Sequence, residues 1–273
     1  MDKVPVKKIR IQRPIVFFLT AVCCLSTAAA IAGSGSFAVE RKPHGHGLPE
    51  GFTPPAPSIQ ALTTAGSQTV YAGSFGMGVF RSDDRGSSWT SVNAGLSDPF
   101  ILSLATGHDG TVYAGTFRGG VFRSRDNGNS WKPVNSGLKR LEIKALLIQE
   151  GTVYAGTGDG LYRMQEGADH WTVVTKGLDE TLVHSIAMAP DRTLYVGTSG
   201  KGLFRYKPNG SEWQRLSRGL VDHEGLIENF IRVLTMDKNQ MLYAGTFDGG
   251  VFLSKDGGVR SAGPCRMIRF VAS

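Results

Sequence analysis

The chain has 273 residues, including 36 glycines, 14 phenylalanines and 4 tryptophans, and 41% of its residues are hydrophobic. This length and composition favour one large all-β domain of short strands and tight turns, or two smaller ones. The formal net charge is +7, yet residues 1–32 contribute +4 of it, and the remainder holds 25 basic and 22 acidic residues. The body has no basic cluster of the kind that forms a nucleic-acid groove, so nucleic-acid binding is not expected.

Residues 1–32 have the features of an export signal. A basic segment precedes the apolar run IVFFLTAVCCLSTAAAIA, which ends in Ala30-Ile31-Ala32. Small residues at the last and third-last positions fit cleavage by signal peptidase. The apolar run is also just long enough to span a membrane, so an uncleaved anchor over residues 14–32 is the alternative. In either case the sequence predicts a periplasmic or secreted body.

Residues 58–262 contain an internal repeat. Tyrosines at 71, 113, 154, 195 and 243 each precede a glycine by two positions, and these glycines are 42, 41, 41 and 48 residues apart. The four tryptophans follow the first four tyrosines by 18, 18, 17 and 18 residues, and each is followed six residues later by Gly-Leu. A period of about 42 residues is typical of four-stranded propeller blades.

Each repeat is predicted to form four short strands. In the second repeat these are FILSLATG, TVYAGTF, GVFRSRD and SWKPVNSG, separated by Gly, Asp and Asn. Alternation in VFRSR and TVYAG gives each strand one apolar face. Because one such sheet cannot bury both of its faces, it must stack on neighbours. The fold class predicted is an all-β propeller with five recognisable blades, the last of them incomplete.

Two repeats carry the motif Ser-x-Asp-x-Gly-x-x-Trp between their third and fourth strands. The motif comprises Ser82, Asp84, Gly86 and Trp89 in the first repeat, and Ser124, Asp126, Gly128 and Trp131 in the second. The aspartate is expected to accept hydrogen bonds from the turn, the glycine to take a positive φ, and the tryptophan to cover the turn. Weaker copies retain Glu166 and Trp171, Gly210 and Trp213, and Ser254, Asp256 and Gly258. Because the motif occurs several times in one domain, it is expected to have a structural role.

The motif resembles the Asp-box, or BNR, repeat, and the resemblance covers about residues 58–258. Proteins built from such repeats include sialidases, xyloglucan-active glycoside hydrolases, sortilin-type receptors and the photosystem II assembly-factor propeller. The resemblance implies a β-propeller and leaves the function open.

The ends of the repeat region leave two architectures open, a five-bladed ring or a piece of a larger ring. The last repeat lacks a recognisable fourth strand, and residues 263–273 are predicted to form an irregular tail. Residues 33–57 are predicted to be a linker rich in Gly and Pro, although a strand near 36–41 could complete the last blade. Without that strand, an open edge would favour self-association.

Any ligand is expected on the upper face, where the loops from second to third strand and from fourth to first strand converge. The candidate residues in these loops are Arg118, Arg140, Asp159, Asp179, Glu180, Lys201, His223, Glu224 and Asp248. Aromatic, acidic and basic groups suit a protein or glycan ligand, and the alternative is that they are turn residues and solvated charges. Phe75, Phe117 and Phe247 share one repeat position, which favours a packing role.

Signatures of catalysis are weak. A glycosidase needs paired carboxylates across a cleft, or in sialidases a tyrosine with an arginine cluster, and the sequence does not bring the loop carboxylates within reach of one another. Ser-His-Asp, P-loop and zinc signatures are missing, so neither cofactor nor metal is expected. The sequence therefore favours an exported, non-catalytic binding or scaffold propeller, and the alternative is a glycoside hydrolase of the Asp-box superfamily.

Overall fold

The computed structural model describes residues 56–174, 178, 180–208, 210, 212–216, 220, 229–247 and 249–255. All the regular secondary structure of these residues is β-strand. No helix in this part of the chain has the length and apolar character needed to cross a membrane. The leader at 1–32, the strand considered at 36–41 and the tail at 263–273 lie outside the described residues.

Nineteen strands form five antiparallel sheets, and within each sheet the strands are ordered as in the sequence. The innermost strands are β1 (Ile59–Ala65), β5 (Ile101–Thr106), β9 (Ile143–Gln149), β13 (Val183–Met188) and β17 (Ile231–Met236). The second strands are β2 (Thr69–Ser74), β6 (Val112–Thr116), β10 (Thr152–Thr157), β14 (Leu194–Thr198) and β18 (Leu242–Thr246). The third strands are β3 (Gly78–Ser82), β7 (Val121–Ser124), β11 (Gly160–Gln165), β15 (Leu203–Tyr206) and β19 (Val251–Ser254). The short outer strands are β4 (Thr90–Ser91), β8 (Lys132–Pro133), β12 (Thr172–Val173) and β16 (Gln214–Leu216).

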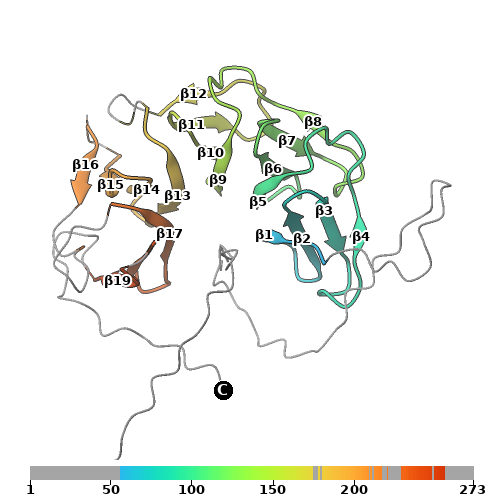
Figure 1. Cartoon of the computed structure of the whole chain (residues 1–273), viewed down its shortest axis with the longest axis horizontal. Helices are drawn as coiled ribbons and strands as arrows, with labels where there is room; N and C mark the ends of the chain where they lie inside the picture. The colour runs from blue at the N-terminus through green and yellow to red at the C-terminus, as the bar shows by residue number, and fades with distance from the viewer. Residues whose placement is uncertain are drawn as a thin grey trace, which may run out of the picture.

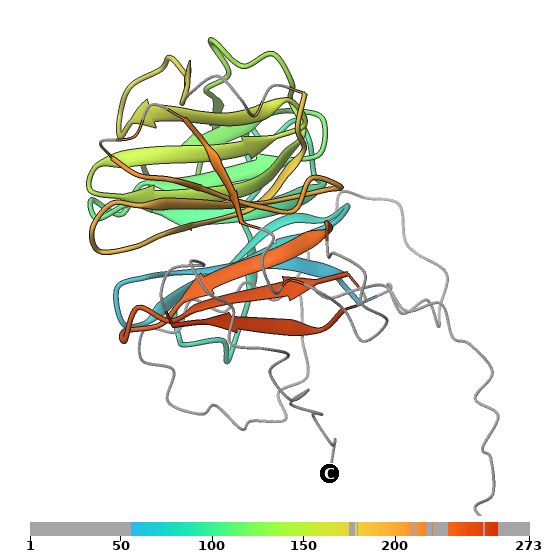
Figure 2. The same ribbon diagram turned by 90° about the vertical axis from the view of Figure 1, so that its left-hand side faces the viewer.

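The sheets are the blades of a β-propeller. They follow one another around an arc with their innermost strands toward the centre (Figure 1), and the side view shows them stacked face to face (Figure 2). Each innermost strand packs on the next, from β1 through β5, β9 and β13 to β17. The predicted all-β fold with four-stranded blades is confirmed, and the fifth sheet has three strands among the described residues.

The glycine of each TVYAG-type segment marks the closest approach between blades. A Cβ atom on Gly115 would lie 2.6 Å from Cγ2 of Ile143, and one on Gly73 would collide with Ile101 in the same way. Both isoleucines are at the start of the next blade's innermost strand and are completely buried. Glycine therefore recurs at this repeat position because the next blade occupies the space of a side chain.

The turns at residues 82–89 and 124–131, here called the acidic turns, are closed by side-chain hydrogen bonds. Asp84 Oδ1 accepts from the Ser88 amide at 2.8 Å and from Ser82 Oγ at 2.7 Å, and Ser82 Oγ accepts from the Gly86 amide at 2.7 Å. Asp126 makes the same set with Ser124 and Ser130. The hydroxyl of Ser88, then that of Ser82, lowers the pKa of Asp84 to about 2, since these bonds favour the ionised form.

The weaker copies close their turns differently. Glu166 does not replace the aspartate, because its carboxyl lies against Gly107 of the preceding blade. Burial, followed by the negative charge of Asp109, raises the pKa of Glu166. In the fourth blade the Gly210 amide donates to the Lys207 carbonyl oxygen at 2.8 Å, and the Trp213 ring lies 5.3 Å from that of Tyr206. Asp256 and Gly258 lie outside the described residues, and Ser254 ends β19.

The tryptophans connect neighbouring blades, which differs from the expected role of covering their own turns. The Trp131 indole donates to the Val92 carbonyl oxygen of the preceding blade, and Trp171 donates to Val134, both at 2.7 Å. These two side chains are 3% and 1% exposed. Trp89, in contrast, is half-buried and donates within its own turn, to Gly86. It belongs to the first described blade, so no blade in the described part of the chain precedes it.

The Gly-Leu pairs complete the same contact. The Trp131 amide donates to the Ala94 carbonyl oxygen at 2.9 Å, and a Cβ atom on Gly95 would collide with the Trp131 carbonyl oxygen. Gly95 also has a φ of 83°, which disfavours a side chain. In the opposite direction Arg81 Nη1 donates to the Asn127 carbonyl oxygen of the next acidic turn at 2.6 Å. The first two interfaces are therefore bonded in both directions, since Arg123 and Trp171 repeat these bonds between the second and third blades.

We expect Gly115→Ala to destabilise the protein by about 1–3 kcal/mol, because its Cβ would lie too close to both Ser103 Oγ and the buried Ile143 side chain of the next blade. Gly245→Ala is the matched control at the same repeat position, since among the described residues its Cβ would meet nothing nearer than Val233 Cβ at 3.6 Å. Urea unfolding followed by circular dichroism measures both. Equal losses would contradict the steric explanation.

Trp131→Ala should cost about 3–5 kcal/mol, the usual range for a buried aromatic side chain. Trp89→Ala should cost clearly less, roughly 1–2 kcal/mol, because the side chain is half-buried and its indole bonds its own turn. The comparison uses the free energy of unfolding at equilibrium. A larger loss at Trp89 than at Trp131 would show that the turn, rather than the blade interface, determines the contribution.

Candidate functional site

Each innermost strand contains a β-bulge near its upper end. There the pairing with the second strand skips one residue, which leaves Gln60, Leu102, Lys144, His184 and Arg232 as the skipped residues of the five blades. A bulge re-aims the side chain of its extra residue. The same irregularity, repeated five times, therefore brings one side chain from each blade to an equivalent position near the axis.

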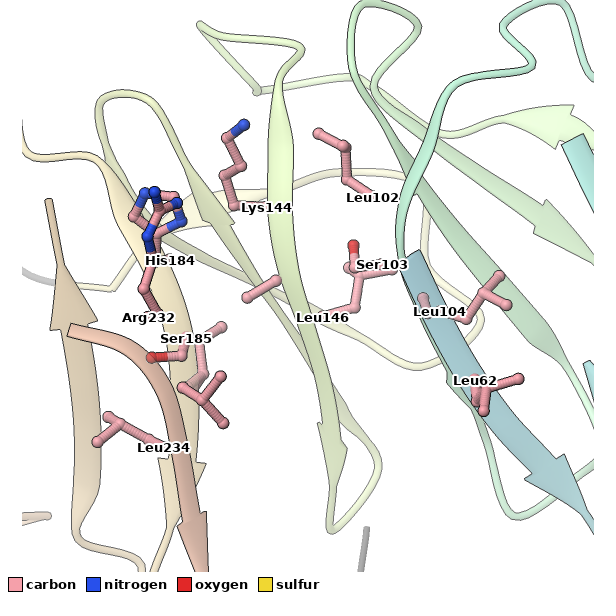
Figure 3. Close-up of a pocket in the computed structure, with 14 residues that line it drawn as sticks. Leu62, Leu102, Ser103, Leu104, Lys144, Leu146, His184, Ser185, Arg232 and Leu234 are labelled. Atoms are coloured by element: carbon pink, nitrogen blue, oxygen red, sulfur yellow. The ribbon is translucent and has the colours of Figure 1, made fainter. Parts of the chain in front are cut away.

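An axial pocket of about 80 Å³ opens between the innermost strands (Figure 3). Four of the five bulge residues line it, namely Leu102, Lys144, His184 and Arg232. Two positions further along each strand is a residue that forms an apolar ring around the same pocket, the ring members being Leu62, Leu104, Leu146, Ile186 and Leu234. The pocket thus combines a polar level at the bulges with an apolar level beneath it.

The polar level is basic on one side. Lys144, His184 and Arg232 come from the adjacent strands β9, β13 and β17, whereas β1 and β5 contribute alanine, leucine and serine. Lys144 Nζ forms an ion pair with Glu142 at 2.7 Å. Burial, then the positive charges of Arg232 and Lys144, lower the pKa of His184 to about 4. The imidazole is therefore neutral at pH 7, between two cations.

Five phenylalanines lie directly before an innermost strand or directly after a second strand, at the strand ends that carry the bulges, and are called here the aromatic rim. The rim consists of Phe75, Phe100, Phe117, Phe230 and Phe247. Phe75 and Phe247 are 44% and 50% exposed and Phe117 is half-buried, so the packing expected at this repeat position is partial. The Phe75 ring centroid lies 4.8 Å from that of Phe100 and 6.1 Å from that of Phe117.

The rim and the basic wall are in contact. The Arg118 guanidinium lies 5.1 Å from the centre of the Phe117 ring, and Lys144 Nζ lies 5.8 Å from the same ring. The Arg232 guanidinium lies 5.1 Å from the centre of the Phe247 ring. These are cation–π distances, so the rings help to hold the cations in place at the upper face.

The site residues predicted from the loops differ in how close they lie to the pocket and in what they bind. Arg118 joins the aromatic rim. Asp159 accepts from Thr157 Oγ1 at 2.7 Å and from the Tyr162 hydroxyl at 3.0 Å, which is a structural role within its turn. Lys201 Nζ donates to Thr181 Oγ1 at 2.8 Å. Arg140 and Glu180 are not among the residues that line the pocket, and Asp179, His223, Glu224 and Asp248 lie outside the described residues.

The sequence pattern did not reveal Lys144, His184 and Arg232, because they lie within strands whereas ligand residues are expected in loops. The sequence feature that marks these residues is their position within the repeat. In the second to fifth repeats the bulge residue directly follows the first buried aliphatic residue of the innermost strand, such as Ile143 or Ile231. Asp98 was also missed, and it is a buried carboxylate that accepts the Arg118 and Gly119 amides at 2.6 and 2.8 Å.

Most of the described carboxylates on the upper face are already bonded to other groups of the protein. Asp98 accepts amides of the loop after β6, Asp159 accepts within its own turn and Glu142 pairs with Lys144, while Glu180 does not line the pocket. Among the described residues no group of three or more His, Cys, Asp or Glu side chains could hold a metal ion. The chemistry that the pocket does offer is anion binding next to aromatic surface.

No protein-family model and no curated protein matches this chain. Solved structures match in fold. The extracellular domain of BT4673 from B. thetaiotaomicron is 21% identical with a TM-score of 0.62, over 76% of this chain and 28% of that one. The GH74 xyloglucanase from Xanthomonas campestris is 18% identical with a TM-score of 0.60, over 75% of this chain and 38% of that one. YCF48 bound to D1 peptide is 12% identical with a TM-score of 0.58, over 72% of this chain and 63% of that one.

These similarities establish the fold and leave the activity open. The chain spans less than two thirds of the length of each of these proteins. They include an extracellular domain, an enzyme and a peptide-bound propeller, so one architecture serves several functions.

His184 predicts a pH dependence of stability. An unfolded histidine has a pKa near 6.5, and in the folded protein it is about 4, so the unfolded chain binds more protons between these values. The contribution of His184 to stability is complete above pH 6.5 and is lost as the pH falls to about 4. Thermal melts from pH 7.5 to 4.5 should therefore show a smaller loss for His184→Gln than for the wild type.

Protonation of Asp84 and Asp126 should not affect this comparison of the two melting curves. Their pKa is about 2, so the stability that they contribute is lost only as the pH falls from the unfolded value of 3.8 toward 2. Parallel curves for the wild type and His184→Gln between pH 6.5 and 4.5 would contradict the prediction.

Proposed function

We propose that this chain is a non-catalytic binding propeller of the Asp-box type, which holds a protein ligand as an extended segment against its upper face. The observation that carries the proposal is the aromatic rim around a basic axial pocket. Aromatic residues and arginine are the residues that dominate binding energy at protein interfaces. Phenylalanines that contact one another and three cations are a surface suited to peptide side chains.

The size of the pocket favours a peptide over a glycan that enters whole. At about 80 Å³ it is far smaller than the 300–1,000 Å³ usual for sites that enclose a small molecule. A single side chain or carboxylate fits, whereas an enclosed chain of sugar rings does not. The rest of the ligand would then lie across the rim.

The export signal predicted at residues 1–32 supports a place for this binding in the periplasm or outside the cell. YCF48, which shares the fold, has been solved with a bound peptide, which supports a propeller face as a peptide platform. A scaffold role follows if the bound segment belongs to a larger protein.

The test is an array that carries synthetic peptides together with glycans, probed with the full chain, alongside a panel of chromogenic glycosides. We expect saturable peptide binding without glycoside turnover. Phe75→Ala should weaken binding at least about five-fold, because it removes the ring that contacts both Phe100 and Phe117. Val173→Ala, at an exposed apolar residue of the outer strand β12, is the matched control and should leave binding unchanged.

Two results would overturn the proposal. Glycan binding without peptide binding would exclude a protein ligand. Glycoside turnover that is abolished by substitution of Asp179 or Glu224 would identify the chain as a hydrolase, the alternative drawn from its repeat.

A further inference from the structure

We infer that the axial pocket binds a carboxylate group of an acidic peptide, placed between Arg232, His184 and Lys144. This inference rests on the proposed function and specifies the chemistry of its ligand. It requires that three nitrogen-bearing side chains face one small space, which the repeated bulges provide by placing them on the adjacent strands β9, β13 and β17 (Figure 3).

Arg232 is the main cation of the site. It forms no ion pair with any residue that the structure describes, and its guanidinium is held against the Phe247 ring. Lys144, in contrast, is paired with Glu142. The pocket mouth therefore has an excess positive charge that its own described carboxylates do not neutralise. A planar guanidinium fixed on an aromatic face is suited to the two oxygens of a carboxylate.

The remainder of the pocket selects a small group with an apolar stem. Leu62, Leu104 and Leu146 lie beneath the polar level, and Leu102 lines the pocket from β5, the strand next to that of Lys144. A glutamate or aspartate side chain matches this arrangement, because its methylene groups contact leucine while its oxygens reach the basic wall. The volume of about 80 Å³ is consistent with one such side chain.

His184 makes ligand binding at this site depend on pH. The charged groups that face it are Lys144 from β9 and Arg232 from β17, both of which disfavour a further positive charge. The strands β10 and β14 also pack against β13, and their residues include no Asp, Glu, Lys, Arg or His. A carboxylate bound among these groups compensates the two cations, so the imidazole takes up a proton and donates an additional hydrogen bond.

The test uses a capped dodecapeptide that carries two phenylalanines and four glutamates, and its counterpart with four glutamines. Affinity for the full chain is measured by calorimetry at constant ionic strength and at pH 7.5, 6.5 and 5.5. We expect the glutamate peptide to bind at least about ten-fold more tightly, and its affinity to rise about ten-fold from pH 7.5 to 5.5. His184→Gln should abolish this rise.

Arg232→Gln should cost at least about ten-fold in affinity for the glutamate peptide, and Arg232→Lys should recover part of that loss. Lys132→Gln is the control, since it removes one positive charge at an exposed position of the outer strand β8. Thermal melts confirm that each variant is folded. An equal effect of Arg232→Gln and Lys132→Gln would show general charge attraction and would overturn the inference.

The other outcomes separate the two proposals. Equal binding of both peptides would leave the peptide-binding function standing and would refute the carboxylate site. Binding of neither peptide, with Arg232-dependent binding of an oligogalacturonate, would retain the carboxylate site and refute the peptide ligand.

Discussion

The close contact between neighbouring blades is the constraint on which the rest of the structure depends. A four-stranded sheet of this size cannot bury both faces alone, so each blade is stable only against another. The backbone of one blade approaches the first isoleucine of the next so closely that Gly73 and Gly115 leave no space for a Cβ atom. The tryptophan indoles and the Arg81 guanidinium then bond across the same interface, in opposite directions. The repeat is conspicuous in the sequence because such contacts recur from one blade interface to the next, as at Trp131 and Trp171.

That packing also creates the candidate site. Ile101 and Ile143 must turn into the blade interface at the start of their strands, while the residues further along face the axis. The bulge inserts one extra residue between the part of the strand that faces the blade interface and the part that faces the axis. The side chain of this extra residue can vary because it points away from the interface. Leu102, Lys144, His184 and Arg232 differ in chemistry at one structural position. Specificity can thus change without loss of the fold.

The fold was predictable from the sequence and the site was not, for one physical reason. Contacts between blades repeat every 42 residues or so, and repetition makes them visible in a single sequence. The axial side chains do not resemble one another, so Lys144 and Arg232 look like ordinary charged residues in strands. Even within the repeat, the role of tryptophan was assigned to the wrong partner, because spacing shows that Trp131 recurs but not that its indole reaches Val92 of the preceding blade. The exposure of Phe75 was likewise hidden by the regularity of its position.

Charged side chains have different roles on the two faces of the propeller. In the acidic turns the carboxylates of Asp84 and Asp126 are saturated by hydroxyl and amide donors, which lower their pKa to about 2 and leave them unsuited to proton transfer near neutral pH. At the opposite end of the strands the cations are held by aromatic rings, and a neutral histidine stands between two of them. Charge on the lower face is therefore used to close turns. Charge on the upper face is left partly uncompensated, and a protein retains such an arrangement at a cost in self-repulsion that a bound anion relieves.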